Sequence, residues 1–260
     1  DLAFGNVVGS NLANLGLVLG ITALIAPIAV QGQIVRREIP LLLLGSAMLL
    51  VFSADSLLRG GPSVLDLADG LGLLLLFLVF FYVTAVDVFR SRDLDPLLGE
   101  IDAVPRFRRE TLTSRNLMVL AGGLLLLYLG GRFTISAGVA LAEDWGVPPS
   151  IIGLLLVAIG TSLPELVTSV MAAYRRESDL AVGNLVGSNI FNGLFVLPVS
   201  ALITDVSIPS GGGADLLFSL ALTALLVPVA LLGRGNISRL WGAGLLMLYV
   251  AYIGVRLLTT

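Results

Sequence analysis

The amino-acid sequence predicts an all-α polytopic membrane protein with inverted-topology repeats and eight transmembrane helices. Of its 260 residues, 57% are hydrophobic and 13% are charged, and the mean hydropathy is +1.00. Soluble domains carry roughly 25% charged residues. Long uncharged runs occur at 39–54, 71–86 and 151–163, and one polar motif occurs twice inside such apolar segments. These observations disfavour the alternative, a soluble protein with unusually apolar core helices.

Eight apolar segments can be delimited along the chain. Most contain about twenty residues, enough at about 1.5 Å per residue to cross a hydrocarbon core of roughly 30 Å. We expect helices, because the strands of a membrane barrel would be short and would alternate in polarity. The segments are 4–26, 39–58, 64–89, 117–141, 150–174, 180–203, 214–232 and 240–258.

The arginines, which are the basic residues of this chain, predict its orientation. If successive segments alternate in direction, twelve arginines fall on one side of the membrane and two on the other, while Arg132 lies inside the fourth segment. By the positive-inside rule the richer side is cytoplasmic. We therefore expect an integral protein of a prokaryotic plasma membrane, with both ends of the chain outside. The richer side holds Arg36, Arg37, Arg90, Arg92, Arg106, Arg108, Arg109, Arg115, Arg175, Arg176, Arg234 and Arg239.

The polar stretch 91–115 divides the chain into two halves. It contains Pro96 and Pro105 and charges of both signs, and we interpret it as a cytoplasmic linker. Residues 1–90 then form the remainder of a first half, and residues 116–260 form the second. Because Asp1 is not a natural start, we expect that the chain is a fragment, cut upstream.

Composition also excludes several classes of function. The chain has no cysteine and no histidine, which excludes disulfides, thiolate metal sites and Ser-His-Asp catalysis. The net charge of −3 argues against nucleic acid as a partner. An intramembrane hydrolase with Ser188 as nucleophile is an alternative, but the chain offers neither histidine nor lysine as its base. We expect a protein that is not an enzyme and has no cofactor.

The polar motif forms an internal repeat. Residues 1–20 align without gaps on residues 179–198, and twelve of the twenty positions are identical. The first copy enters the membrane from outside, and the second, five crossings later, enters from inside. Opposite orientations of one sequence make an inverted-topology repeat, which is typical of secondary transporters. The identical pairs include Gly5/Gly183, Asn6/Asn184, Gly9/Gly187, Ser10/Ser188, Asn11/Asn189 and Asn14/Asn192.

Glu165 is the strongest candidate for a functional residue. A carboxylate inside a spanning helix costs roughly 2.5–3.5 kcal/mol on insertion scales, so it indicates function. Thr161 and Ser162 lie four and three residues before it and share its helix face. Pro164 disrupts the helix locally and frees the carbonyl of Gly160.

A structural ion pair between Glu165 and Arg132 is the alternative to a functional carboxylate. Further oxygen donors occur in the repeat itself, where Ser188 and Asn192 share a helix face, as do Ser10 and Asn14. We expect Asn184 and Asn189 to brace the helices by hydrogen bonding. All of these are hard oxygen ligands, which favour Ca²⁺, Na⁺ or Mg²⁺ over transition metals.

The motif GTSLPE followed by GN-x-x-GSN-x-x-N resembles the α-repeat of the sodium/calcium exchanger family, within the Ca²⁺/cation antiporter superfamily. The resemblance implies ten transmembrane helices in two inverted halves, of which eight are present, with ion sites where the α-repeats meet. The stretch 158–197 corresponds to a complete second α-repeat. By the same resemblance Glu165 is a ligand of both Ca²⁺ and Na⁺. The other implied ligands are Thr161, Ser162, the carbonyl of Ala158, Ser188, Asn192, Ser10 and Asn14.

The chain departs from the family pattern in two ways. The GTSLPE-like half of the first repeat is missing, and with it one acidic ligand. Some members have aspartate where this chain has Asn192, which bears on stoichiometry and potassium dependence. The sequence thus predicts a secondary active transporter in the lipid bilayer that exchanges Ca²⁺ for Na⁺ by alternating access, with a proton-coupled Ca²⁺/cation antiporter as the alternative.

Overall fold

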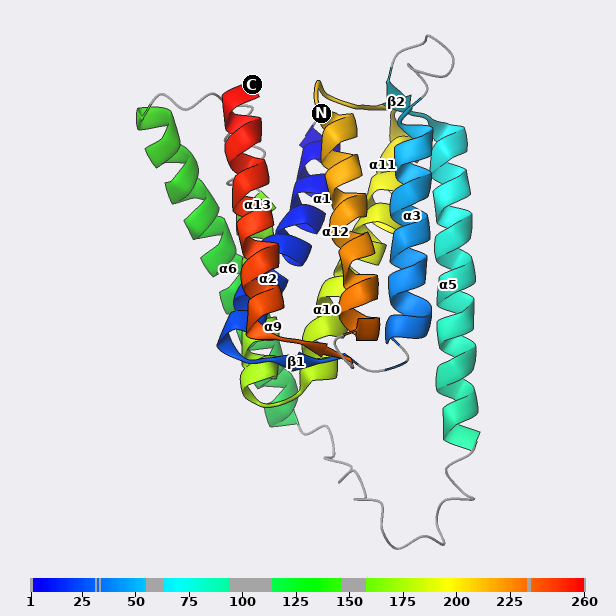
Figure 1. The fold of residues 1–260 in the computed structure, drawn as a ribbon, viewed down its shortest axis with the longest axis vertical. Helices are drawn as coiled ribbons and strands as arrows, with labels where there is room; N and C mark the ends of the chain where they lie inside the picture. Colours follow the sequence, from blue (N-terminus) through cyan, green and yellow to red (C-terminus); the bar gives the residue numbers. More distant parts are fainter. Residues whose placement is uncertain are drawn as a thin grey trace, which may run out of the picture.

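The computed structural model describes residues 2–30, 32, 34–54, 63–93, 114–145, 158–232 and 235–259, and it is a helical bundle (Figure 1). The helices that lie outside the two copies of the repeated motif pack around them or form the edges of the bundle. They are η2 (Ile34–Glu38), α3 (Ile39–Phe52), α5 (Leu67–Asp93), α6 (Ser114–Asp144), α8 (Ala158–Thr161), α9 (Leu163–Tyr174), α12 (Gly212–Leu232) and α13 (Arg239–Thr259).

The two copies of the repeated motif fold alike. Each is a continuous helical rod whose middle turn widens to a π-helix close to its third asparagine, Asn14 or Asn192. Each rod also holds a hydroxyl bonded to the carbonyl four residues earlier, Thr22 to Val18 at 2.7 Å and Ser200 to Val196 at 3.0 Å. The rods are α1 (Leu2–Leu12), η1 (Ala13–Val18) and α2 (Leu19–Ile25), and α10 (Ser178–Phe191), η4 (Asn192–Val196) and α11 (Leu197–Ile203).

The two rods run in opposite directions. In Figure 1 the chain enters α1 near the top of the view and leaves α2 near the bottom, whereas α10 begins near the bottom and α11 ends near the top. Two short antiparallel strand pairs close the opposite ends of the bundle, β1 with β4 and β2 with β3. The strands are β1 (Ile28–Ala29), β2 (Val64–Leu65), β3 (Val206–Ser207) and β4 (Asn236–Ile237).

Small residues let the outer helices approach the rods closely. A β-carbon added to Gly242 of α13 would lie 2.8 Å from the carbonyl oxygen of Gly20 on α2. On the other side of the bundle, a β-carbon on Gly70 of α5 would lie 3.0 Å from the carbonyl oxygen of Pro198 on α11. Gly20 and Pro198 are matching positions of the repeat. The two rods therefore use the same point for contact with an outer helix, and small residues are the usual means of such contacts in membranes.

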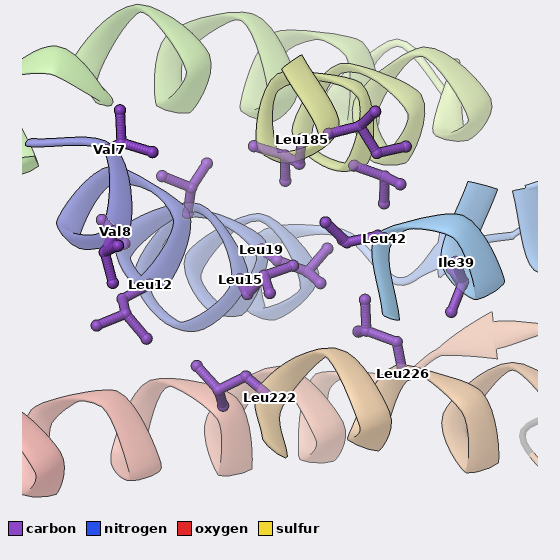
Figure 2. Close-up of a cluster of buried hydrophobic side chains, with 14 of the residues drawn as sticks. Val7, Val8, Leu12, Leu15, Leu19, Ile39, Leu42, Leu185, Leu222 and Leu226 are labelled. Carbon is purple, nitrogen blue, oxygen red and sulfur yellow. The ribbon is translucent and has the colours of Figure 1, made fainter. Parts of the chain in front are cut away.

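The apolar core lies around the first rod. Figure 2 shows side chains of α1, η1 and α2 between α10 on one side and α12 on the other, with α3 at one end. The largest of them are almost completely buried, and this packing holds the polar parts of the two rods in place. The labelled residues are Val7, Val8, Leu12, Leu15, Leu19, Ile39, Leu42, Leu185, Leu222 and Leu226.

Ion pairs join helices near both ends of the bundle. Asp215, which is 2% exposed, accepts from Arg256 Nε at 3.0 Å and from the Tyr252 hydroxyl at 2.5 Å, so it holds α12 against α13. Arg37 pairs with Asp87 and so links η2 to α5. Both pairs lie near helix ends, where the penalty for charge is smaller than at the middle of a membrane.

Five helices of the described chain are long and apolar enough to cross a membrane, against eight predicted segments. The other three segments were predicted at 39–58, 150–174 and 214–232. The second segment gives the 14-residue α3, and its remainder lies outside the described residues. The fifth is interrupted between α8 and α9, and the seventh is matched by α12, Gly212–Leu232. The linker 91–115 also lies almost entirely outside the described residues.

Replacing Gly242 by alanine tests the contact between α13 and α2. The added methyl group would meet Ala23 Cβ at 2.8 Å as well as the Gly20 carbonyl. Because overpacking typically costs about 1–3 kcal/mol, we expect a lower midpoint of thermal unfolding in detergent. Gly244→Ala on the same helix is the control, since its β-carbon meets nothing within 4 Å. Equal midpoints for the two variants would contradict the close approach.

Candidate ion-binding site

The site is built on a break between α8 and α9. Ser162 interrupts the helix with φ −91° and ψ 0°, and the new helix starts at Leu163 with Pro164 in its first turn. Proline is tolerated there because the first amides of a helix have no intrahelical partner. The predicted disruption at Pro164 is confirmed. It leaves the polar groups of Thr161 and Ser162 beside the start of a helix, deep in an apolar bundle.

Gly160 allows α6 to cover this break. Gly160 is buried, and a β-carbon there would lie 2.1 Å from Ile135 Cγ1 on α6. Glycine is therefore required sterically at this position. The Gly160 carbonyl faces Gly131 of α6, whose added β-carbon would lie 3.7 Å from it.

Glu165 lies in the first turn of α9, where the helix dipole favours a negative charge. Its Oε1 accepts a hydrogen bond from Ser188 Oγ of α10 at 3.2 Å. Its Oε2 is buried and has no hydrogen-bond partner within the described part of the chain. Arg132 is exposed on α6, and no ion pair of the described residues joins it to Glu165. The alternative of a structural Glu165–Arg132 pair is therefore not supported.

The hydroxyls at the break face the first rod. Ser162 Oγ lies 3.0 Å from Ser10 Oγ of α1, and both side chains are buried. Thr161 Oγ1 donates a hydrogen bond at 3.4 Å to Oδ1 of Asn6, which also lies on α1. The break in the second half of the chain is thus lined by the first copy of the repeated motif, 152 residues away along the chain for the Ser10–Ser162 pair.

Four asparagines connect the two rods, and matching residues exchange roles. Asn11 Nδ2 donates to the Asn189 carbonyl at 3.3 Å, and Asn189 Nδ2 donates to the Asn11 carbonyl at 3.1 Å. Asn14 Nδ2 donates to Asn189 Oδ1 at 2.9 Å, and Asn192 Nδ2 donates to Asn11 Oδ1 at 3.1 Å. Each bond has a counterpart in which both partners are replaced by their equivalents in the other copy.

The structure brings most of the predicted residues together in small groups. Glu165 meets Ser188, Ser162 meets Ser10, and both Asn14 and Asn192 bond to the opposite rod. Ala158 begins α8, two turns from Glu165. The role of these residues as ligands stays a prediction.

Asn6 and Asn11 were not among the predicted ligands. The signal was available, because they match Asn184 and Asn189, which were expected to brace the helices. Asn184 does hydrogen bond to α9, at 3.0 Å from Thr168 Oγ1 and 3.3 Å from Ser169 Oγ. Asn189 bonds to the first rod, so hydrogen bonding by both residues is confirmed.

The chemistry of the site suits a hard cation. Its polar groups are hydroxyls, amides and one carboxylate, and no group of three or more acidic, histidine or cysteine residues occurs among the residues that could be searched. Two buried oxygens, Glu165 Oε2 and Asn14 Oδ1, have no hydrogen-bond partner within the described chain. Buried polar atoms of this kind require an explanation, and a bound cation is one.

Comparison with known protein families identifies the family of this chain. The family model described as sodium/calcium exchanger protein matches residues 1–86 and 115–258, on both sides of the linker. The chain belongs to the sodium/calcium exchanger protein family. The expected resemblance is therefore confirmed, and the family is one of exchangers.

Individual members of the sodium/calcium exchanger family align with nearly the whole chain. The putative antiporter CaxA of Alkalimonas amylolytica is 38% identical over 255 residues, which are 97% of this chain and 77% of that protein. The sodium/calcium exchanger MaX1 of Methanosarcina acetivorans is 28% identical over 98% of this chain and 79% of its own length. Among solved structures, the sodium-calcium exchanger NCX_Mj superposes with a TM-score of 0.74 at 27% identity, over 97% of this chain and 76% of that chain.

Changing Gly160 to alanine tests the cover of α6 on the break. The new methyl group would collide with Ile135 Cγ1 and Cδ1, but Ile135 Cβ would lie 3.5 Å away, an ordinary contact. We therefore expect Gly160→Ala to lower the thermal midpoint in detergent, and Ile135→Ala in the same protein to restore part of it. A double variant no more stable than Gly160→Ala alone would contradict the assigned contact.

Proposed function

We propose that this protein exchanges Ca²⁺ for Na⁺ across a membrane by alternating access, with Glu165 as the charged ligand of the transported ions. The observation that carries the proposal is the buried Oε2 of Glu165, which lies at a helix break and has no hydrogen-bond partner in the described chain. Membership of the sodium/calcium exchanger family and likeness to NCX_Mj support it. Ca²⁺ and Na⁺ are substrates here, not resident cofactors.

The proposed ligands come from the break between α8 and α9 and from both rods. Hydroxyl and amide oxygens suit Na⁺ as well as Ca²⁺, and Ca²⁺ accepts six to eight oxygens in irregular arrangements. Donors from several interrupted helices can provide such an arrangement. The proposed set is Glu165, Thr161, Ser162, the Ala158 carbonyl, Ser188, Asn192, Ser10 and Asn14.

Exchange rather than leak follows from the charge of Glu165. An uncompensated carboxylate at membrane depth is costly, so a site without a cation would reorient slowly. A site that holds Ca²⁺, or instead Na⁺, is compensated and can change its access. Because both ions use the same oxygens, each would displace the other, and a gradient of Na⁺ would drive Ca²⁺ across the membrane.

We also propose that the two halves are inverted-topology repeats, 1–90 and 116–260, joined by the linker 91–115. The opposite directions of the rods (Figure 1) and the exchanged asparagine bonds support a two-fold relation between them. The end of the bundle with β1 and β4 would face the cytoplasm. Arg36 and Arg37 lie in η2, Arg239 begins α13, and Arg175 and Arg176 lie in the turn between α9 and α10, all at that end, in keeping with the positive-inside rule.

Glu165→Gln tests the proposed charged ligand. In proteoliposomes of the full-length protein, we expect the variant to lose at least 90% of Na⁺-driven ⁴⁵Ca²⁺ uptake, since the amide removes the charge that balances the cation. Glu177→Gln is the matched control, because Glu177 is exposed in the turn between α9 and α10. It should transport like the unmodified protein.

The same vesicles separate Na⁺ coupling from proton coupling. Uptake should follow an imposed Na⁺ gradient at constant pH and should not follow a pH gradient in the absence of Na⁺. Normal uptake by Glu165→Gln would contradict the assigned ligand. Uptake driven by pH alone would replace the proposed exchange with proton-coupled antiport.

A further inference from the structure

The asparagine pair Asn11 and Asn189 lies beside the proposed ligands without belonging to them. Asn189 is 1% exposed and Asn11 is 6% exposed, so their amides are shielded from water. Each uses its own Nδ2 on the backbone carbonyl of the other, at 3.1 and 3.3 Å. These two bonds consume one donor from each side chain and leave its Oδ1 available.

Each available oxygen accepts from a proposed ligand of the opposite rod. Asn189 Oδ1 accepts from Asn14 Nδ2 at 2.9 Å, and Asn11 Oδ1 accepts from Asn192 Nδ2 at 3.1 Å. An amide has two chemically different ends, one that donates and one that accepts. Once its nitrogen is held, the orientation of its oxygen is fixed.

The consequence is visible at Asn14. Its side chain is 0% exposed, its nitrogen is bonded to Asn189, and its Oδ1 is buried without a hydrogen-bond partner in the described residues. If this amide rotated by half a turn, its NH₂ group would take the place of that oxygen. A cation would then meet two N–H donors in place of a ligand, and Asn189 Oδ1 would face another oxygen.

The local backbone supports the same interpretation, that the ligand asparagines are held in one orientation. The π-helices begin at Ala13 and Asn192, and in each the amide five residues on bonds to the carbonyl of the ligand asparagine, Leu19 to Asn14 and Leu197 to Asn192. Such π-turns are frequent at functional sites. Here the wider turn and the amide–amide bond act on the same residue, the first on its backbone and the second on its side chain.

We propose that Asn11 and Asn189 are positioning residues that hold the amides of Asn192 and Asn14 with their oxygens toward the transported cation. The arrangement is crossed, since each repeat orients the ligand that the other repeat supplies. Removal of either positioning residue should therefore weaken cation binding through one identified ligand. This inference rests on the proposed function, because it takes Asn14 and Asn192 as cation ligands.

The test is a double-mutant cycle on cation binding. Equilibrium binding of ⁴⁵Ca²⁺ to purified full-length protein is measured for the unmodified protein, Asn189→Ala, Asn14→Ala and the double variant. We expect Asn189→Ala to weaken binding by about fivefold, the size typical of one lost hydrogen bond. In the Asn14→Ala background, Asn189→Ala should change binding by less than about twofold, because the ligand that it orients is already gone.

Two controls separate positioning from general stability. Asn184→Ala removes a bonded asparagine from the same helix, α10, but Asn184 contacts Thr168 and Ser169 and no proposed ligand amide. Asn184→Ala should change ⁴⁵Ca²⁺ binding only slightly. In the double variant with Asn14→Ala, the two fold-changes in binding should multiply, as for independent sites. If Asn189→Ala does not fold, Asn11→Ala with Asn192→Ala gives the equivalent cycle on the other rod.

The outcomes distinguish this inference from the proposed function. Unchanged binding in Asn189→Ala, or independent effects of Asn189→Ala and Asn14→Ala, would overturn the positioning role even where exchange is intact. Competent and coupled Ca²⁺ binding without Na⁺-driven uptake would instead contradict the proposed exchange and support the positioning role. No ⁴⁵Ca²⁺ binding by the unmodified protein would overturn both.

Discussion

Hydrogen bonds between the two rods set the register on which the rest of the bundle depends. Apolar packing around α1 and α12 is non-directional, and it would tolerate small shifts of one helix along another. The amides of Asn11, Asn14 and Asn189 are almost completely buried, and each must meet its partner within hydrogen-bond distance. A shift of a single residue would leave buried donors unpaired, at about 1–3 kcal/mol each. Directional contacts of this kind specify one arrangement where packing alone would permit several.

That register also determines the environment of Glu165. With the rods in place, Ser10 of the first rod reaches Ser162 at the helix break, and Ser188 of the second rod reaches the carboxylate. Pro164 and Gly160 shape the break itself, and α6 covers it. A carboxylate in such a place is unfavourable unless a cation or a donor compensates it. The bundle supplies one hydroxyl donor to Oε1, and a transported cation would supply the remaining compensation at Oε2.

The sequence predicts this region because the motifs that mark it are local. The Gly-Thr-Ser-Leu-Pro-Glu run predicts a helix break with a carboxylate beside it, and the structure has the break at Ser162. The twenty-residue repeat predicts matching polar positions in two helices, which is how Asn14 and Asn192 were found. Spacing along a helix was enough to place Ser188 and Asn192 on a shared face.

The features that the sequence did not predict depend on contacts between distant segments. The π-turns at Asn14 and Asn192 cannot be distinguished from an ordinary helix by apolar spacing over so few residues. Asn11 and Asn6 gained their partners from the packing of α1 against α10 and α8, which no single segment encodes. The apolar segment at α3 was predicted to end at residue 58, whereas α3 ends at Phe52. Hydropathy alone does not show where a helix ends.

The central claim is that Ca²⁺ and Na⁺ occupy the same oxygens, which the helix break at Ser162 and the two rods provide together. Displacement at equilibrium tests it most directly, on purified protein and without a membrane gradient. ⁴⁵Ca²⁺ bound to the full-length protein is measured as Na⁺ is raised at constant ionic strength, with choline as the replaced cation. The account predicts complete displacement of Ca²⁺ by Na⁺, because both ions use the same oxygens. Ca²⁺ that stays bound at saturating Na⁺ would contradict it.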